Sequence, residues 1–164
     1  MTANPARRLV AWLALAYTSA SFAQGGPAVV GDLFDARPRA ATVHGRSCEV
    51  AQLYVELINS KRYDELHTLF AANAVFLTPV GKVLQGPRDI GEFYKSMVGS
   101  LQPDIVPVSF ISDGDACVME LAAKTNRDDG EGYRLSAIDH FTVNAEGKII
   151  NMIVYLRPDR QRGM

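Results

Sequence analysis

The sequence predicts an α+β domain in which a curved, mostly antiparallel sheet wraps around three helices. Three observations lead to this expectation. Apolar residues follow a helical period between residues 48 and 98, they alternate with a period of two after residue 103, and short polar turns separate the alternating runs. Helices followed by consecutive hairpins favour a fold in which the helices cover one face of an antiparallel sheet.

Composition limits the number of domains and the classes of partner. The 164 residues have the length of one ordinary domain, and 48% hydrophobic residues can supply a core. A formal net charge of -1, from 17 basic and 18 acidic residues without a dense run of either sign, excludes nucleic acid as a partner class. Two cysteines cannot form a disulfide framework, and no Cys or His set has zinc-site spacing, so we expect no metal and no cofactor.

The first 24 residues have the pattern of a secretory signal peptide. Arg7 and Arg8 precede an apolar run over 9–17, and a small-residue stretch ends at Ala23, where we expect cleavage. The run is too short to span a membrane, so the processed protein would have no membrane anchor. The alternative is a helix that packs on the domain. A cleaved signal would make the protein periplasmic or secreted, and without one it would be cytoplasmic.

The next segment, 25–46, is rich in Gly, Pro, Ala and Arg and has neither apolar period. This composition is typical of a linker or of an extension draped over the domain. We therefore expect the folded domain at 47–158 and a short tail at 159–164.

Helical spacing predicts three helices before residue 98. The first helix follows Ser47 as its N-cap, and the second is short and begins near Asp64. The third helix begins at Gly86-Pro87, because proline suits the first turn of a helix. A brief strand over 74–78 separates the second and third helices. The apolar stripes are Val50, Leu53, Tyr54, Leu57 and Ile58; Tyr63, Leu66, Leu69 and Phe70; and Ile90, Phe93, Tyr94 and Met97.

Four β-rich runs follow, over 105–112, 116–125, 133–143 and 148–157. Alternation places Asp139 on the apolar face between Ala137 and Phe141, so its carboxyl must be paired, solvated in a cavity or protonated. The predicted inner face comprises Cys117, Met119, Leu121, Ala123, Tyr133, Leu135, Ala137, Asp139 and Phe141. The predicted outer face comprises Glu120, Lys124, Arg134, Ser136, His140 and Thr142.

The last run is apolar on both faces of the predicted strand. Ile150, Met152, Val154 and Leu156 alternate with Ile149, Asn151, Ile153 and Tyr155. An apolar outer face commonly packs against a second subunit. We therefore expect a homodimer formed through this face.

Several short motifs carry a family resemblance in their order and spacing. They are Tyr54-Val55, Leu69-Phe70-Ala71, Pro79-Val80-Gly81, Gly86 with Ile90 and Glu92-Phe93-Tyr94, and Ile138-Asp139-His140-Phe141 with Asn144 and Gly147-Lys148. Together, from about residue 48 to 156, they resemble bacterial steroid Δ5-isomerase, in the ketosteroid isomerase-like branch of the nuclear transport factor 2-like superfamily. The resemblance implies a cone-shaped α+β barrel that encloses an apolar pocket.

The resemblance also implies roles for three residues. Tyr54 and Asp139 match the pair that donates hydrogen bonds to a developing enolate oxygen, and Tyr94 matches the tyrosine that supports the first of them. An apolar site keeps such a carboxyl neutral, as the family exemplifies. Thr78 stands where the family places its aspartate base, and a threonine hydroxyl is a poor base near neutral pH. Ordinary steroid isomerisation by the family route is therefore not expected.

Three explanations remain for the missing aspartate: another base, a different reaction at the same oxyanion hole, or ligand binding alone. One candidate base is His67 on the second helix, for which the alternative is a packed structural histidine. The others are His44, Asp32 and Asp35 in the extension, for which the alternative is a solvated loop position. Cys117 is interpreted as a free thiol that lines the pocket. The expected substrate-binding residues are Phe76, Thr78, Cys117, Met119, Leu121, Ala123, Phe141, Met152, Val154 and Leu156.

Such a lining suits a small, flat, apolar aromatic, terpenoid or steroid-like substrate with one carbonyl or phenol oxygen. The leading hypothesis is a cofactor-independent isomerase or lyase in which Tyr54 and Asp139 stabilise an oxyanion. The alternative is a non-catalytic binding or carrier protein. A third hypothesis is a structural dimerisation module.

Overall fold

A computed structural model of the chain describes residues 37–127 and 132–157. The predicted signal peptide, most of the extension including Asp32 and Asp35, and the tail at 159–164 lie outside the described residues, so those expectations stay predictions. None of the helices in these two described ranges is long and apolar enough to cross a membrane.

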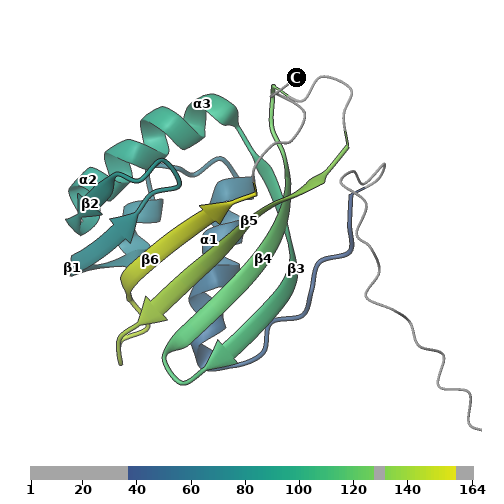
Figure 1. Cartoon of the computed structure of the whole chain (residues 1–164). Helices are drawn as coiled ribbons and strands as arrows, with labels where there is room; N and C mark the ends of the chain where they lie inside the picture. The colour runs from purple at the N-terminus through teal and green to yellow at the C-terminus, as the bar shows by residue number, and fades with distance from the viewer. Residues whose placement is uncertain (1–36, 128–131, 158–164) are drawn as a thin grey trace, which may run out of the picture.

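One six-stranded sheet forms the body of the domain, in the order β2-β1-β6-β5-β4-β3. All neighbouring strands pair antiparallel except β1 and β6, which are parallel. The sheet curves around the helices, with α1 behind β4 and β5 (Figure 1). This arrangement confirms the predicted fold class. The strands are β1 (Phe70–Leu77), β2 (Val83–Gln85), β3 (Asp104–Asp113), β4 (Ala116–Lys124), β5 (Arg134–Val143) and β6 (Ile149–Leu156).

Two of the three predicted helices are well developed. The first is α1 (Glu49–Asn59), preceded by the short 3-10 turn η1 (Arg46–Cys48), and the last runs through α2 (Gly86–Phe93), the π-helical turn η3 (Tyr94–Val98) and α3 (Gly99–Leu101). Pro87 lies in the first turn of α2, as expected. The second predicted helix is only the 3-10 turn η2 (Leu66–Leu69).

Strand β1 begins four residues before the prediction because Phe70 is already extended and pairs with Ile149 of β6. Strand β2 was not predicted, because three residues are too few to establish an alternation.

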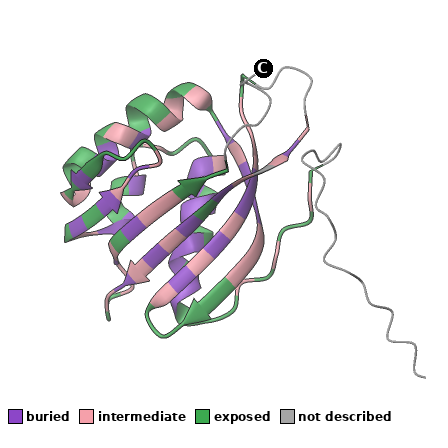
Figure 2. Cartoon of the chain, viewed as in Figure 1, coloured by how far each residue is buried: buried purple, intermediate pink, exposed green. Residues whose placement is uncertain are grey.

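The core lies between α1, η3 and the concave face of the sheet, where buried residues recur along the strands (Figure 2). On β5 the predicted alternation is confirmed for Ala137, Asp139 and Phe141, which are all buried. It is wrong for Tyr133, which packs with Val106 and Ala122 in a separate cluster. A register shift between β4 and β5 after Leu121 explains the difference, because one additional residue reverses the facing of those beyond it.

The described part of the extension follows β3, an edge strand of the sheet. The Ala41 backbone N–H donates to the Pro107 carbonyl at 2.8 Å. Arg37 donates to the Tyr133 hydroxyl at 3.2 Å and forms an ion pair with Asp104 at 3.2 Å. The Ala41 contact pairs a backbone carbonyl that an open sheet edge would leave unpaired, and the Arg37 contacts hold the extension beside that edge.

Cys48 and Cys117 form a disulfide that joins the start of α1 to β4, across 69 residues of sequence. The interpretation of Cys117 as a free thiol is therefore wrong. Two cysteines are too few to indicate a pairing from sequence, because their proximity depends on how the sheet curves over α1.

Candidate functional site

Two tyrosines from different helices meet in the core. Tyr54 lies on α1 and Tyr94 at the start of η3, with exposures of 6% and 1%. The Tyr94 hydroxyl donates a hydrogen bond to the Tyr54 hydroxyl at 3.4 Å and lies 3.5 Å from the Met152 sulfur. Their rings meet edge-on, with centroids 5.9 Å apart. The fold thus brings together the two tyrosines that the sequence placed at the site.

Aromatic packing fixes both rings. Tyr94 stacks nearly parallel on Phe76 at 5.8 Å and meets Phe93 edge-on at 5.6 Å. Tyr54 meets Phe141 of β5 edge-on at 5.5 Å. Such ring pairs have preferred geometries and each adds about 0.5–1.5 kcal/mol beyond burial, so the hydroxyls are held in place by the rings.

Asp139 lies in the middle of β5, opposite Met119 of β4 and Val154 of β6. Its side chain is 2% exposed, and Oδ1 has no hydrogen-bond partner among the described residues. Burial raises the pKa of this carboxyl to about 7, because a low-dielectric environment penalises the charged form. The carboxyl is therefore neutral or half-ionised near neutral pH.

The three groups lie within electrostatic reach of one another. Burial raises the pKa of Tyr54 well above its ordinary value, and the nearby Tyr94 and Asp139 raise it further. Burial is also the main cause of the raised pKa of Tyr94, to which Asp139 contributes. Both phenols therefore keep their protons at any physiological pH. The cluster can offer hydrogen bonds from neutral donors to an oxygen atom, and one carboxyl that can gain or lose a proton.

Thr78 is 2% exposed at the end of β1, and its polar groups close a turn. Its backbone N–H donates to the Lys82 carbonyl at 2.9 Å, and its hydroxyl oxygen accepts from the Lys82 backbone N–H at 3.0 Å. The threonine in the family's base position thus has a structural role in the turn between β1 and β2.

The structure does not bring the candidate histidines into the tyrosine–aspartate cluster. His67 is exposed on η2, with its ring Nδ1 2.7 Å from the Asp64 carbonyl oxygen, and His44 is exposed before η1. The buried polar residues among those described are Ser47, Thr78 and Asp139. Asp139 is therefore the one buried residue among the described Asp, Glu, His, Lys and Arg side chains.

Most of the predicted lining residues pack on the inner face of the sheet beside this cluster. Seven are buried, namely Thr78 in its turn and Phe76, Cys117, Met119, Leu121, Phe141 and Met152, while Ala123 and Val154 are half-buried against the same core and Leu156 is exposed. Sequence reasoning missed Phe70 and Phe93, which complete the aromatic packing around Tyr94. Both residues belong to the predicted apolar stripes, and that position could have indicated that they pack beside Tyr94.

Over 37–127 and 132–157, no group of three or more His, Cys, Asp or Glu side chains is arranged to bind a metal ion.

Sequence comparison places residues 51–152 in a known family, the SnoaL-like domain. The chain belongs to the SnoaL-like domain family. This match, with the fold, confirms the resemblance to the ketosteroid isomerase-like branch of the nuclear transport factor 2-like superfamily. No curated protein is significantly similar in sequence.

Several solved structures share the fold. The epoxide hydrolase/cyclase-like enzyme SalBIII, from pyran ring formation in the polyether salinomycin, is 28% identical over 68% of this chain and 91% of its own, with a TM-score of 0.57. RV0760c from Mycobacterium tuberculosis is 16% identical over 71% and 95%, with a TM-score of 0.59. A putative ketosteroid isomerase from Kribbella flavida is 14% identical over 73% and 87%, with a TM-score of 0.57.

Proposed function

We propose that this SnoaL-like protein is a cofactor-independent isomerase or lyase that acts on a small, largely apolar substrate with a carbonyl or phenol oxygen. The observation that carries the proposal is the buried Asp139 carboxyl, whose Oδ1 has no partner, beside the Tyr54–Tyr94 hydroxyl pair. A buried polar atom without a partner costs about 1–3 kcal/mol, so its retention calls for a functional explanation.

The proton transfer is assigned to Asp139, because Thr78 is engaged in a turn and both histidines are exposed. A carboxyl with a pKa of about 7 is well suited to take and return a proton at neutral pH. The ionised carboxylate removes a proton from the carbon next to the substrate carbonyl. The resulting enolate oxygen accepts hydrogen bonds from Tyr54 and from the newly protonated Asp139.

The enolate can then follow two routes. In an isomerisation, Asp139 returns the proton to a different carbon and the double bond migrates. In an elimination, the enolate electrons expel a leaving group from the carbon next to the deprotonated one, and Asp139 passes its proton to that departing group. In both routes Tyr94 supports Tyr54 through its donated hydrogen bond and does not contact the substrate.

The solved relatives support a small-molecule role of this kind. SalBIII is described as an epoxide hydrolase/cyclase-like enzyme with a role in pyran ring formation, which is chemistry on a small organic molecule. RV0760c has been crystallised with estradiol-17beta-hemisuccinate, and a designed 17-OHP binder shares the fold. Flat apolar molecules are therefore the first substrates to try.

The proposal can be tested without knowing the natural substrate. Small β,γ-unsaturated and aryl ketones are incubated with the protein in D₂O, and deuterium uptake at the carbon next to the carbonyl is followed by NMR. We expect Asp139→Asn to reduce the rate by about 10²–10⁴-fold, because the amide can donate a hydrogen bond but cannot carry the proton. Tyr54→Phe should reduce it by roughly 10²–10³-fold. Tyr155→Phe, which removes an exposed hydroxyl, serves as the control.

A ligand carrier is the second candidate, favoured by the structural role of Thr78 in place of a base. A carrier would bind phenols or ketones without accelerating exchange, and Asp139→Asn would weaken binding alone. The third hypothesis, a structural dimerisation module, would be favoured if the protein bound none of the phenols and ketones tested.

We also propose that the chain forms a homodimer through the convex face of the sheet. A row of residues that are apolar apart from His140 crosses all six strands there, and Ile153 of β6 lies in its middle. Successive partners in the row are Ile111, Val118, His140, Ile153, Leu77 and Val83. Ile153→Lys should convert a dimer into a monomer in light scattering, while Glu120→Lys, on the same face outside the row, should not.

Export of the protein is a further proposal. The signal-like start and the Cys48–Cys117 disulfide both fit an oxidising compartment. Fractionation and N-terminal sequencing should find a mature chain that begins at Gln24 outside the cytoplasm.

A further inference from the structure

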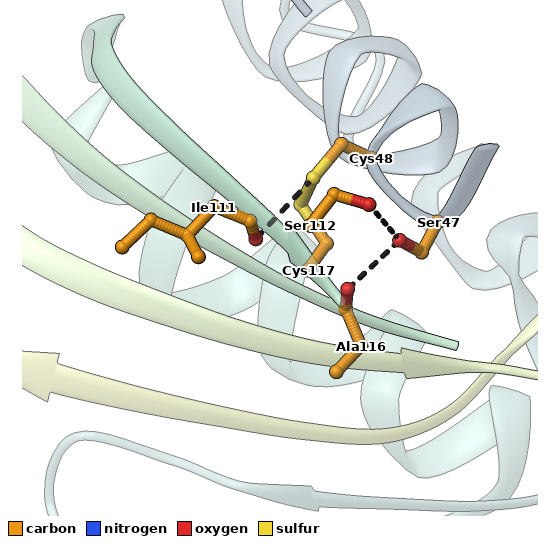
Figure 3. The surroundings of a disulfide bond; sticks show 6 residues. All are labelled: Ser47, Cys48, Ile111, Ser112, Ala116 and Cys117. Carbon is orange, nitrogen blue, oxygen red and sulfur yellow. Dashed lines mark hydrogen bonds between the residues drawn. A yellow bond between two sulfur atoms is a disulfide. The ribbon is translucent and has the colours of Figure 1, made fainter. Parts of the chain in front are cut away.

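The Cys48–Cys117 disulfide lies where α1 meets the sheet. Cys48 directly precedes α1, Cys117 is near the start of β4, and their Cα atoms are 5.1 Å apart. Figure 3 shows the bond between the N-terminal end of α1 and the strands of the sheet. The link therefore joins the helix that carries Tyr54 to the strand next to the one that carries Asp139.

Hydrogen bonds reinforce this junction. The Ser47 hydroxyl donates to the Ala116 carbonyl at 2.8 Å and lies 2.8 Å from the Ser112 hydroxyl (Figure 3). Arg46 donates to the Ala145 carbonyl, in the turn between β5 and β6, at 2.6 Å. The start of α1 is thus attached to the hairpin of β3 and β4 and to the following hairpin.

The other end of α1 is also attached. The Asn59 side chain donates to the Ile105 carbonyl at 2.8 Å and accepts from the Ile105 backbone N–H at 2.8 Å. Tyr54 lies between the two attachments, six residues after Cys48 and five before Asn59. A helix held at both ends presents a residue in its middle at a fixed height above the sheet.

The disulfide and the site share one strip of the inner face. Cys117 is paired across the sheet with Phe141, whose ring meets Tyr54 edge-on at 5.5 Å. Met119, two residues along β4, is paired with Asp139. A displacement of α1 at the disulfide would therefore change the Tyr54–Phe141 contact first, and with it the approach of Tyr54 to Asp139.

We infer that Cys48 and Cys117 are positioning residues, whose disulfide sets the placement of Tyr54 relative to Asp139 and makes the site dependent on the oxidised state. The inference rests on the proposed function of that pair. Reduction by an added dithiol or phosphine delivers two electrons and two protons, which convert the disulfide to two thiols. Without the link, no covalent bond holds the start of α1, which then depends on the packing of Val50 and Ala51 and on hydrogen bonds that water can replace.

The test compares oxidised wild-type protein with the full-length Cys48→Ala/Cys117→Val variant, which keeps apolar volume at the junction but removes the link. Val106→Ala is the matched control, because it opens a buried position in the separate cluster. All proteins are studied where circular dichroism shows them folded, with sucrose added to stabilise any that are not. Reduced wild-type protein provides a second form without the link.

Two spectroscopic readouts report on the site itself. In the forms without the link, we expect the nuclear Overhauser effect between the Tyr54 and Phe141 rings to fall below half of its intensity in oxidised wild-type protein. We also expect the pKa of Asp139, followed by ¹³C NMR of labelled aspartate, to fall by about one unit as water enters. The deuterium-exchange rate should fall by about 100-fold. Val106→Ala should leave both spectroscopic readouts unchanged.

An unchanged ring contact and an unchanged Asp139 titration in folded protein without the link would overturn the inference and leave the proposed function standing. An ordinary carboxyl pKa in oxidised wild-type protein would instead contradict the proposed function, and the ring contact would still decide whether the disulfide positions Tyr54.

Discussion

The Tyr94 hydroxyl, on η3, donates a hydrogen bond to the Tyr54 hydroxyl on α1, 40 residues away in sequence. Because Tyr54 is the acceptor in this contact, its own proton remains available for another oxygen. Asp139 lies within electrostatic reach of both phenols and keeps an oxygen without a partner. The relationship between the tyrosines therefore defines the direction in which a substrate oxygen would be held.

Removing the Tyr94 hydroxyl should weaken the site without disturbing the fold. Tyr94→Phe keeps the ring that stacks on Phe76, so the free energy of unfolding should change by no more than about 1 kcal/mol. The deuterium-exchange rate should fall by roughly 10-fold, because Tyr54 becomes a weaker and less well oriented donor. The assay above measures the rate, and urea unfolding measures the stability. An unchanged rate would show that Tyr94 has only a packing role.

Stability should depend on pH through Asp139. Burial raises its folded-state pKa to about 7, above its ordinary value of 3.8, so the folded protein keeps a proton that the unfolded chain has lost. This contribution to stability is full below the unfolded-state pKa and is lost as pH rises through the folded-state pKa. Its size is roughly 4 kcal/mol, from about 3 units at about 1.4 kcal/mol each.

Urea unfolding at a series of pH values, from near the unfolded-state pKa to slightly alkaline pH, measures this loss of stability. Asp139→Asn should be less sensitive to pH than wild type and relatively more stable at the alkaline end, because the amide has no charge to bury. The same pH sensitivity in both proteins would assign the effect to other groups.

Reducing the disulfide should destabilise the whole domain. A link across 69 residues restricts the unfolded chain and contributes roughly 4 kcal/mol in the chain-entropy description. The midpoint of urea unfolding should therefore fall when a phosphine is added to wild-type protein, whereas the Cys48→Ala/Cys117→Val variant should not respond. A response of the variant would point to an effect of the reductant itself.

A side chain at Gly45 should be strongly destabilising, because this residue has a left-handed backbone conformation and lies directly against Ser112 of β3. Its φ is +83°, and an added Cβ would lie 2.2 Å from the Ser112 hydroxyl oxygen. Gly147 has a similar φ of +77° with nothing within 4 Å of an added Cβ. Gly147→Ala should cost about 1 kcal/mol of strain, and Gly45→Ala more than that, measured as free energies of unfolding. Equal costs would mean that Ser112 moves aside freely.

The parts of the site that depend on local periodicity could be predicted from the sequence. Alternation placed Asp139 on the inner face, and helical spacing together with the family resemblance selected Tyr54 and Tyr94. Both patterns survive folding because a strand or helix fixes the direction of each side chain relative to its neighbours.

The parts that depend on tertiary contacts could not be predicted. The register shift between β4 and β5 turned Tyr133 into the separate cluster, since an alternation cannot be followed through a bulge. The engagement of Thr78 with Lys82 is a feature of one turn, and the Cys48–Cys117 bond requires knowledge of the curvature of the sheet over α1. Local patterns contain no information on either contact.

The titration of Asp139 in the oxidised, full-length protein is the sharpest test of its assignment as the group that carries the proton. With aspartate labelled at the side-chain carboxyl carbon, and Asp139→Asn used to assign the signal, we expect a transition at a pKa of about 7. A transition near 3.8, the ordinary value for an aspartate, would mean that the carboxyl is hydrated and charged, and would contradict the assignment of Asp139 as the group that carries the proton.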